Sequence, residues 1–294
     1  MKISRALLCC ICTCLTLFIG TSSVCYGTTL KEIRERGYLR HLAVPYAKFA
    51  TIHGDGLDCA LMKRFAEHLG VQYKLVPTSF DAALKDLTGR NTYAETANPK
   101  VVTGDILASG ITILDSRKAI AKFSRPTFRS QTWLLAKPAS DLQPISSTGD
   151  ANNDILQTLK LLGSKTVVGI PDTCLDVTHY PLLQKSAANT FNLPASTISQ
   201  PFEFIGMEHE LFLMESASIL IALSVWPYQF KIIGPISTPM EMGAVFAPES
   251  EELRKTFAVF FKEIWANGEY QKMVNHYYPT AFRHFEQLFT KSAP

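Results

Sequence analysis

Short apolar segments alternate with amphipathic segments along this chain, in two separate blocks. The first block predicts strands at Leu39–Val44, Val71–Val76 and Asp105–Ala108, with helices at Asp58–Leu69 and Phe80–Leu87 between them. Strand–helix–strand order of this kind is typical of parallel sheets covered by helices. The sequence therefore predicts an α/β fold.

The second block follows a stretch rich in proline, serine and acidic residues, "KPASDLQPISSTGDANND", which marks a change of composition. Such stretches commonly separate folding units. The elements predicted after it are helices at Ile155–Leu162, from Thr173, and at Ser216–Ser224, with strands at Thr166–Ile170, Leu211–Met214 and Phe230–Ile233. Two lobes, each with its own sheet, are therefore expected.

The helix at Asp58–Leu69 is the most clearly marked element. Its apolar residues recur at helical spacing, and Gly70 follows its last turn. These are the ordinary signals of an amphipathic helix and its end. Asp58 is expected to cap the first turn.

Residues 1–27 are expected to be a signal peptide that is cleaved near Gly27. Lys2 and Arg5 precede an uncharged apolar run, Ala6–Gly20, which is shorter than the roughly twenty residues of a membrane-spanning helix. Five of the seven cysteines lie in this segment, so a disulfide scaffold is excluded. Cys59 and Cys174 remain, either as two buried thiols or as one bridge.

Charge and motifs exclude several classes of function. Removing Lys2 and Arg5 from the 29 basic residues leaves 27 against 26 acidic residues, a net charge of +1. Nucleic acid is therefore not expected as a partner. The histidines show no ligand spacing, and Walker and G-x-S-x-G motifs are absent, so neither a metal nor a cofactor is expected.

Four segments carry a resemblance to a known family. In chain order they read "LKEIRERGYLRHLAVPYAKF", "GDGLDCALMKRFAEHLGVQYKLV", "GDILASGITILDSRKAIAKFSRPTF" and "VFAPESEELRKTFAVFFKEIWANGEYQKMVNHYYP". From about Leu30 to Tyr278, the chain resembles a family 3 extracellular solute-binding protein of the amino-acid ABC transporter type. The resemblance implies the type II periplasmic-binding-protein fold, two α/β lobes that close on a small solute.

In that fold two strands cross between the lobes. Here they are expected at Thr132–Ala136 and Met242–Ala247. The first lobe would then comprise residues 28–131 and 248–294, and the second lobe residues 132–247.

The resemblance also implies a carboxylate-binding motif, T-x-x-x-x-R, which Thr112 and Arg117 match, with Gly110 just before it. A guanidinium presents paired donors that fit the two oxygens of a carboxylate, and a site closed to water strengthens this pairing. The alternative for Arg117 is a solvated residue on a basic turn. Tyr46 is expected over the ligand, or else in a surface turn, and Trp133 lines the cleft or packs at the hinge.

In the second lobe, relatives place a Gly-Thr-Thr-like turn at a helix N-terminus, where free N–H groups favour an anion. This chain has Asp172, Thr173 and Cys174 there, so Thr173 is the expected contact, while Asp172 is either a contact or a helix cap. Amino-acid binders also place an aspartate after the next strand, against the ligand ammonium. Glu215 stands at that position, as an ammonium partner or as an acid favouring the following helix N-terminus.

The expected function is non-enzymatic capture of a small carboxylate-bearing, amino-acid-like solute by lobe closure. The protein is expected to be a periplasmic monomer that delivers its solute to a membrane permease. Two alternatives stay open: a cyclohexadienyl dehydratase-like enzyme using Glu215 or Asp172, and a sensory binding module. A murein transglycosylase would need a further catalytic domain, for which the residues after the second crossing leave no room.

Overall fold

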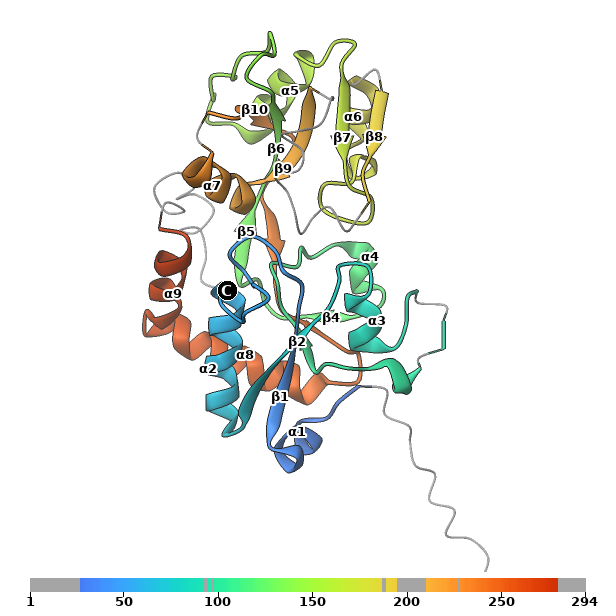
Figure 1. Ribbon diagram of the computed structural model, residues 1–294, viewed down its shortest axis with the longest axis vertical. Helices are drawn as coiled ribbons and strands as arrows, with labels where there is room; N and C mark the ends of the chain where they lie inside the picture. The colour runs from blue at the N-terminus through green and yellow to red at the C-terminus, as the bar shows by residue number, and fades with distance from the viewer. Residues whose placement is uncertain are drawn as a thin grey trace, which may run out of the picture.

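The computed structural model describes residues 27–92, 95–96, 98–186, 189–194, 210–226 and 228–279 of the chain. Two five-stranded sheets form two lobes, one above the other (Figure 1). The expected signal peptide lies outside the described residues, apart from Gly27. Within the described ranges, every helix is too short or too polar to cross a bilayer.

The first lobe contains a sheet of order β2-β1-β3-β12-β4. Its strands are β1 (Tyr38–Ala43), β2 (Gln72–Pro77), β3 (Ile106–Leu107), β4 (Lys122–Phe123) and β12 (Val245–Phe246). β1 pairs in parallel with β2 and β3, as predicted, whereas β12 pairs antiparallel with β3 and β4. A strand from late in the chain therefore completes the middle of this sheet.

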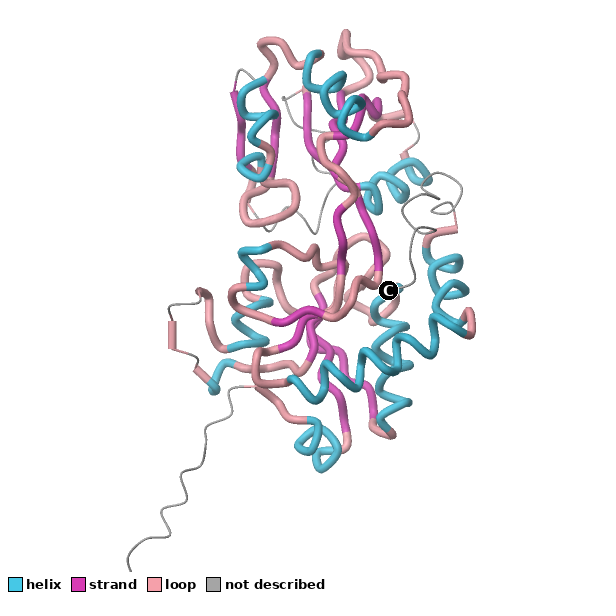
Figure 2. Tube along the Cα trace, turned by 180° about the vertical axis from the view of Figure 1, so that it is seen from behind, coloured by secondary structure: helices cyan, strands magenta, loops and turns pink. Residues whose placement is uncertain are grey.

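Among the described residues, six helices belong to this lobe. They are α1 (Leu30–Arg36), α2 (Leu57–Leu69), α3 (Ala83–Thr88), α4 (Asp115–Lys118), α8 (Glu251–Ala266) and α9 (Glu269–Tyr277), with a 3-10 turn at Pro99–Val101. α2, α8 and α9 pack together beside the sheet (Figures 1 and 2). Phe65 of α2 contacts Phe257 and Phe260 of α8, with 5.1 Å between ring centroids in each pair. Such aromatic packing stabilises the join between the two ends of the chain.

The second lobe contains a sheet of order β10-β6-β9-β7-β8. Its strands are β6 (Thr132–Ala136), β7 (Thr166–Gly169), β8 (Asn189–Asn192), β9 (Leu211–Glu215) and β10 (Lys231–Pro235). β7 is parallel to β8 and β9, and β6 is antiparallel to β9 and β10. Its helices are α5 (Ala151–Lys160), α6 (Pro181–Ser186) and α7 (Ser216–Val225), with a 3-10 turn at Val177–His179.

β5 (Phe128–Ser130) and β11 (Met240–Met242) form an antiparallel ribbon between the lobes, which Figure 2 shows from behind. Each crossing lies a few residues earlier than predicted. Thr132–Ala136 is β6 of the second sheet, and Met242–Ala247 is divided between β11 and β12. The apolar runs that suggested crossings are apolar because they are buried in the two sheets. Residues 243–247 therefore lie with the first lobe.

Candidate functional site

The predicted site residues come from both lobes and meet at the boundary between them. They follow the carboxyl ends of β1 and β3 in the first lobe, and of β7 and β9 in the second. Ligands of α/β sheets bind outside the carboxyl ends of the strands. The first-lobe members are Tyr46, Gly110, Thr112 and Arg117, and the second-lobe members are Asp172, Thr173 and Glu215.

Arg117 lies on α4, and its guanidinium reaches across the boundary. Nη1 donates to the carbonyl of Thr112 at 2.9 Å, and Nη2 donates to the carbonyl of Asp172 at 3.0 Å. The guanidinium carbon lies 5.1 Å from the centre of the Phe80 ring. Arg117 is only 6% exposed, and burial lowers its pKa. No carboxylate among the described residues forms an ion pair with it, so this is not the solvated arginine that its basic neighbours suggest.

Thr112 also joins the two lobes. It forms an antiparallel bridge with Met242 at the end of β11, and its side chain lies near the thiol of Cys174. Burial raises the pKa of Cys174 to about 12, so the thiol stays neutral. Cys174, interpreted from the sequence as merely buried, is a second-lobe contact of this motif.

Glu215 and Tyr46 form a third contact between the lobes. Glu215 is fully buried at the start of α7, where one carboxyl oxygen accepts from the N–H of Ser218 at 3.1 Å. The other oxygen accepts from the hydroxyl of Ser130 on β5. The Tyr46 hydroxyl accepts from the Ser218 hydroxyl at 3.3 Å and lies close to the same carboxyl. Glu215 therefore caps α7, the second of the two roles considered for it, while facing Tyr46.

Gly110 stands between β3 and the Thr112–Arg117 segment. Its φ of +63° lies in the left-handed region, and a Cβ there would come within 2.4 Å of the Phe49 ring. Its N–H donates to the carboxyl of Asp58 at 2.7 Å. The prediction that Asp58 caps α2 is wrong, because the cap is Gly56 and the carboxyl is directed at Gly110 instead. Burial raises the pKa of Asp58 to about 7.

The helix predicted from Thr173 is not formed. Asp172 has a φ of +61°, and the Thr173 hydroxyl donates to the Ile170 carbonyl while accepting from the N–H of Leu175 at 2.9 Å. A hydroxyl that bonds to nearby backbone favours a turn over a helix. The anion-binding helix N-terminus expected at this turn is therefore wrong, and the next helical residues begin at Val177.

Trp133 lies in the middle of β6, opposite Met214 of β9 and Pro235 of β10. It is half-buried and packs against the core of the second lobe. Trp133 therefore packs within the second lobe and not at the β5–β11 hinge. Its role as a ligand contact stays a prediction.

A cavity of about 510 Å³ adjoins Arg117 and is called the Arg117 cavity below. Its apolar wall is formed by Phe80, Leu107, Ile111 and Ile120, and its polar wall includes Lys85, Asp172, Asp176, Thr178 and His179. Its volume is within the range of small-molecule sites. Glu215 and Thr173 have no exposed surface. Neither residue is among those that line this cavity.

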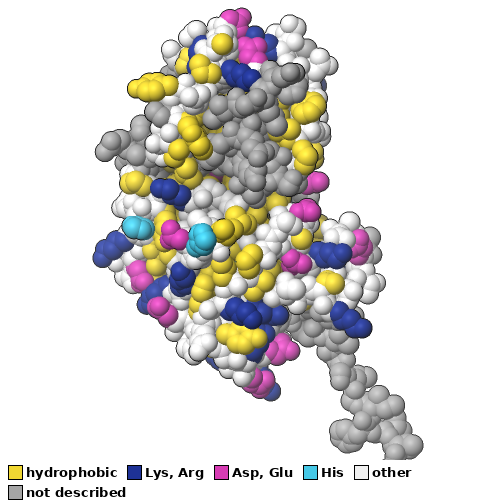
Figure 3. All heavy atoms as spheres, viewed as in Figure 1, with side chains coloured by type: hydrophobic (Ala, Val, Ile, Leu, Met, Phe, Trp, Pro, Cys, Tyr) yellow, Lys and Arg dark blue, Asp and Glu magenta, His cyan; other side chains and the backbone are white. Residues whose placement is uncertain are grey.

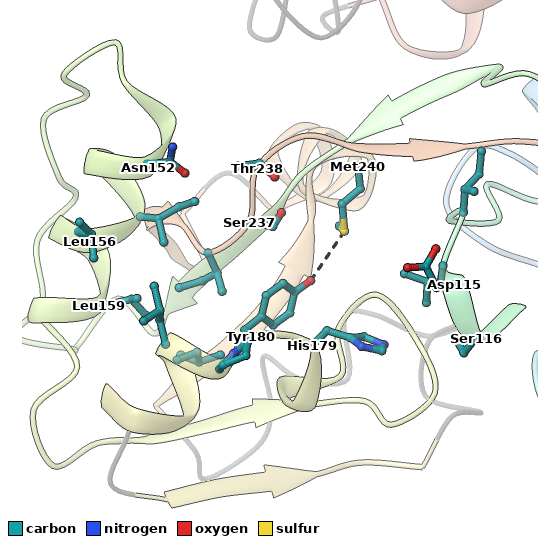
Figure 4. A pocket seen from close by; sticks show the side chains of 17 residues that line it. Asp115, Ser116, Asn152, Leu156, Leu159, His179, Tyr180, Ser237, Thr238 and Met240 are labelled. Atoms are coloured by element: carbon teal, nitrogen blue, oxygen red, sulfur yellow. Dashed lines mark hydrogen bonds between the residues drawn. The ribbon is translucent and has the colours of Figure 1, made fainter. Parts of the chain in front are cut away.

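A second cavity, of about 780 Å³, lies between α5, α6 and the segment that leads into β11 (Figure 4). Leu156 and Leu159 of α5 face Tyr180, whose hydroxyl contacts the Met240 sulfur at 3.9 Å. Among the described residues that line it there is neither lysine nor arginine. The smaller Arg117 cavity, in contrast, is lined by the cations Lys85 and Arg117 together with the carboxylates of Asp81, Asp172 and Asp176.

Phe80, Asp58 and Ser130 belong to the site but were not predicted as site residues. Phe80 could have been predicted from the sequence, because it follows β2. The carboxyl ends of neighbouring parallel strands meet at one edge of a sheet, where ligands bind. The sequence placed Phe80 in a helix, whereas α3 begins at Ala83. Ser130 carried no such signal, since its contact with Glu215 joins distant parts of the chain.

Neither metal ligation nor a disulfide is found in the described part of the chain. No group of three or more His, Cys, Asp and Glu side chains there is placed to hold a metal ion. Cys59 and Cys174 are both free and buried, one in each lobe. On the face shown in Figure 3, basic and acidic side chains are interspersed over the lower lobe.

The family model for bacterial extracellular solute-binding proteins, family 3, matches residues 43–280. The chain belongs to this family. A solute-binding role and the two-lobed type II periplasmic-binding-protein fold are thereby confirmed, as is the resemblance noted from the sequence. This family 3 protein gives no match to a curated protein sequence.

Solved structures share the fold of this family 3 protein. A mutant of ArgBP from T. maritima superposes with a TM-score of 0.66 at 20% identity, covering 86% of this chain and 100% of that chain. The ancestral amino acid-binding protein AncCDT-1, a precursor of cyclohexadienyl dehydratase, gives 0.63 at 21% identity, with coverage of 85% and 98%. An amino acid ABC transporter substrate-binding protein from Streptococcus pneumoniae, bound to L-arginine, gives 0.63 at 17%, with coverage of 86% and 98%.

Proposed function

We propose that this family 3 protein captures a small carboxylate-bearing solute outside the cytoplasmic membrane and delivers it to a membrane permease. The observation that carries the proposal is Arg117. It is a buried cation without a carboxylate partner among the described residues, and it lines the Arg117 cavity. A buried charge is costly unless it is paired, so this site is suited to an anion.

The geometry leaves room for bidentate recognition. A guanidinium has five N–H donors, and the contacts to the carbonyls of Thr112 and Asp172 engage one on each of Nη1 and Nη2. The remaining donors can bind the two oxygens of a carboxylate without loss of the contact between the lobes. Phe80 covers one face of the guanidinium, and both residues line the cavity.

Closure of the two lobes would couple solute binding to the overall conformation of the protein. Arg117, Thr112 and Tyr46 of the first lobe each contact the second lobe directly. A solute held by Arg117 adds to these contacts and favours the closed state by its differential affinity for it. A permease can then distinguish the loaded form from the empty one.

Delivery and location follow from the family and from the expected signal peptide. One structural neighbour is the substrate-binding protein of an amino acid ABC transporter. We propose the same kind of partner here, a periplasmic location after cleavage near Gly27, and a monomeric protein. Tyr46, Gly110, Thr173 and Trp133 remain proposed contributors to the site.

The enzymatic alternative is a dehydratase-like reaction, since AncCDT-1 is described as a precursor of cyclohexadienyl dehydratase. Burial raises the pKa of Glu215, as a general acid requires. That carboxyl, however, has no surface on the Arg117 cavity. Incubation with prephenate tests the alternative, and formation of an aromatic product would favour it over capture alone.

A thermal-shift screen of the purified protein against amino acids, organic acids and sugars tests the proposal. A carboxylate at a hundredfold excess over its Kd should stabilise the protein by about 2.7 kcal/mol. Arg117→Ala should abolish the shift. Lys118→Ala is the matched control, because Lys118 neighbours Arg117 on α4 but pairs on the surface with Asp115, at 3.0 Å. A saturable hit that survives Arg117→Ala would contradict the proposal.

A further inference from the structure

Glu215 is surrounded by donors that belong to the protein itself. One oxygen accepts from the N–H of Ser218 at 3.1 Å and lies 3.4 Å from its hydroxyl. The other oxygen accepts from the hydroxyl of Ser130, and the Tyr46 hydroxyl lies close by, 3.3 Å from the Ser218 hydroxyl. With no exposed surface, Glu215 contacts nothing but protein.

An α-ammonium group of a solute would need both acceptors and space beside Glu215, and this part of the structure does not provide them. It has three N–H donors, all of which need acceptors once water is excluded. It also needs room beside an ionised carboxylate, because an unpaired buried cation is costly. Tyr46 fills the first-lobe side of Glu215, and the carboxyl is held from the second-lobe side by Ser130 and Ser218.

The opposite end of the site is arranged differently. Arg117 is bonded only to carbonyl groups, which carry no net charge, and it has surface on the Arg117 cavity. The site thus offers the guanidinium of Arg117 to the solute at one end, whereas the carboxylate of Glu215 is already occupied by protein donors.

We infer that the solute is a carboxylate without an α-ammonium group, because the Tyr46 hydroxyl holds the place beside Glu215 where that group would bind. This inference rests on the proposed function and narrows its solute class. The body of the solute lies in the Arg117 cavity, against the apolar wall of Phe80 and Ile111. Asp81, Asp172 and Asp176 also line this cavity, together with the cations Lys85 and Arg117. The class is therefore small carboxylic acids with an apolar or aromatic body.

Matched pairs of ligands test the inference directly. Each pair has one carbon skeleton with and without the α-amino group: phenylalanine and 3-phenylpropionate, leucine and 4-methylpentanoate, valine and 3-methylbutanoate. Titration calorimetry should give at least about tenfold tighter binding for the acid that lacks the amino group. Arg117→Ala should remove binding of that acid.

A second arm uses Tyr46→Phe, which keeps the ring and removes the hydroxyl. The variant should shift the ratio of the two Kd values at least about tenfold toward the α-amino acid, since Glu215 gains an open place. Tyr73→Phe is the matched control, because the hydroxyl of Tyr73 bonds to His41 at 2.9 Å, within the first lobe. The ratio is read within one variant, so a general loss of stability does not alter it.

The outcomes separate the two proposals. Tighter binding of the α-amino acid by the unmodified protein overturns the inference and leaves carboxylate capture intact. Failure of all three amino-free acids to bind also overturns it. Binding that does not depend on Arg117 overturns the proposed function as well.

Discussion

The backbone N–H of Gly110 donates a 2.7 Å hydrogen bond to the carboxyl of Asp58. This bond links the first turn of α2 to the segment that carries Thr112 and Arg117. Asp58 is only 5% exposed, so water cannot replace it as the acceptor. The direction in which Arg117 leaves the first lobe therefore depends on a residue that does not line the Arg117 cavity.

Asp58→Ala should lower both the stability of the protein and its affinity for the solute. Removing the acceptor leaves a buried N–H unsatisfied, which costs about 1–3 kcal/mol. Asp58→Asn keeps an oxygen for Gly110 and should restore most of the affinity. Urea unfolding and calorimetry on both variants check this, and equal affinity of Asp58→Ala and the unmodified protein would contradict it.

Asp58 and His41 should give opposite dependences of stability on pH. Burial raises the pKa of Asp58 from 3.8 to about 7, so the native state keeps a proton that the unfolded chain loses. The free energy of unfolding therefore falls as pH rises from about 4 to about 7. Burial lowers the pKa of His41 from 6.5 to about 4, so this residue makes unfolding easier as pH falls through that interval.

The two slopes, each up to about 1.4 kcal/mol per pH unit, should largely cancel in the unmodified protein. Asp58→Asn should expose the His41 slope, with stability rising between about pH 4.5 and about pH 6.5. His41→Gln should expose the Asp58 slope, with stability falling over that interval. Urea titrations at several pH values measure both, and slopes of the same sign would refute the assignment.

Gly110→Ala should destabilise the protein strongly and weaken solute binding. The added Cβ meets the Phe49 ring at 2.4 Å, and the residue must keep a φ of +63°. Strain of about 1–2 kcal/mol combines with about 1–3 kcal/mol of overpacking. Gly268→Ala is the control, because its φ is +76° but its Cβ would have nothing within 4 Å. A similar loss in both variants would show that the Phe49 contact contributes little.

Asp105→Ala should cost about 3–5 kcal/mol, because it leaves two partly buried arginines without their carboxylate. Asp105 is bonded to Arg36 and, at 2.8 Å, to Arg40, and its side chain has no exposed surface. Glu35→Gln removes a 3.7 Å surface pair with Lys31 and should cost under about 1 kcal/mol. Chemical denaturation distinguishes the two effects.

The local pattern was enough to predict elements whose apolar face is continuous. α2 begins one residue before the predicted helix and ends at the same residue, and β6 matches its prediction. Arg117 could be found because the motif sits within a single short segment. The turn after β7 could not be predicted from the pattern, because the Thr173 hydroxyl competes for backbone groups that a helix would use.

Contacts between segments that lie far apart in the sequence also could not be predicted. Glu215 was recognised as an acid at the start of a helix, which it is. Its bond to Ser130 and its proximity to Tyr46 depend on how the lobes meet, and no spacing along the chain encodes that arrangement. The same holds for the proximity of Thr112 to Cys174.

The position of β12 between β3 and β4 has a consequence for biosynthesis. A nascent chain that has emerged only as far as β11 can assemble the sheet of the second lobe, but it lacks the strand that joins β3 to β4. Until residues 245–246 arrive, the strands of the first lobe present unpaired edges, which are prone to association with other chains. Passage across a membrane before folding would therefore leave completion of this lobe to one of the last segments delivered.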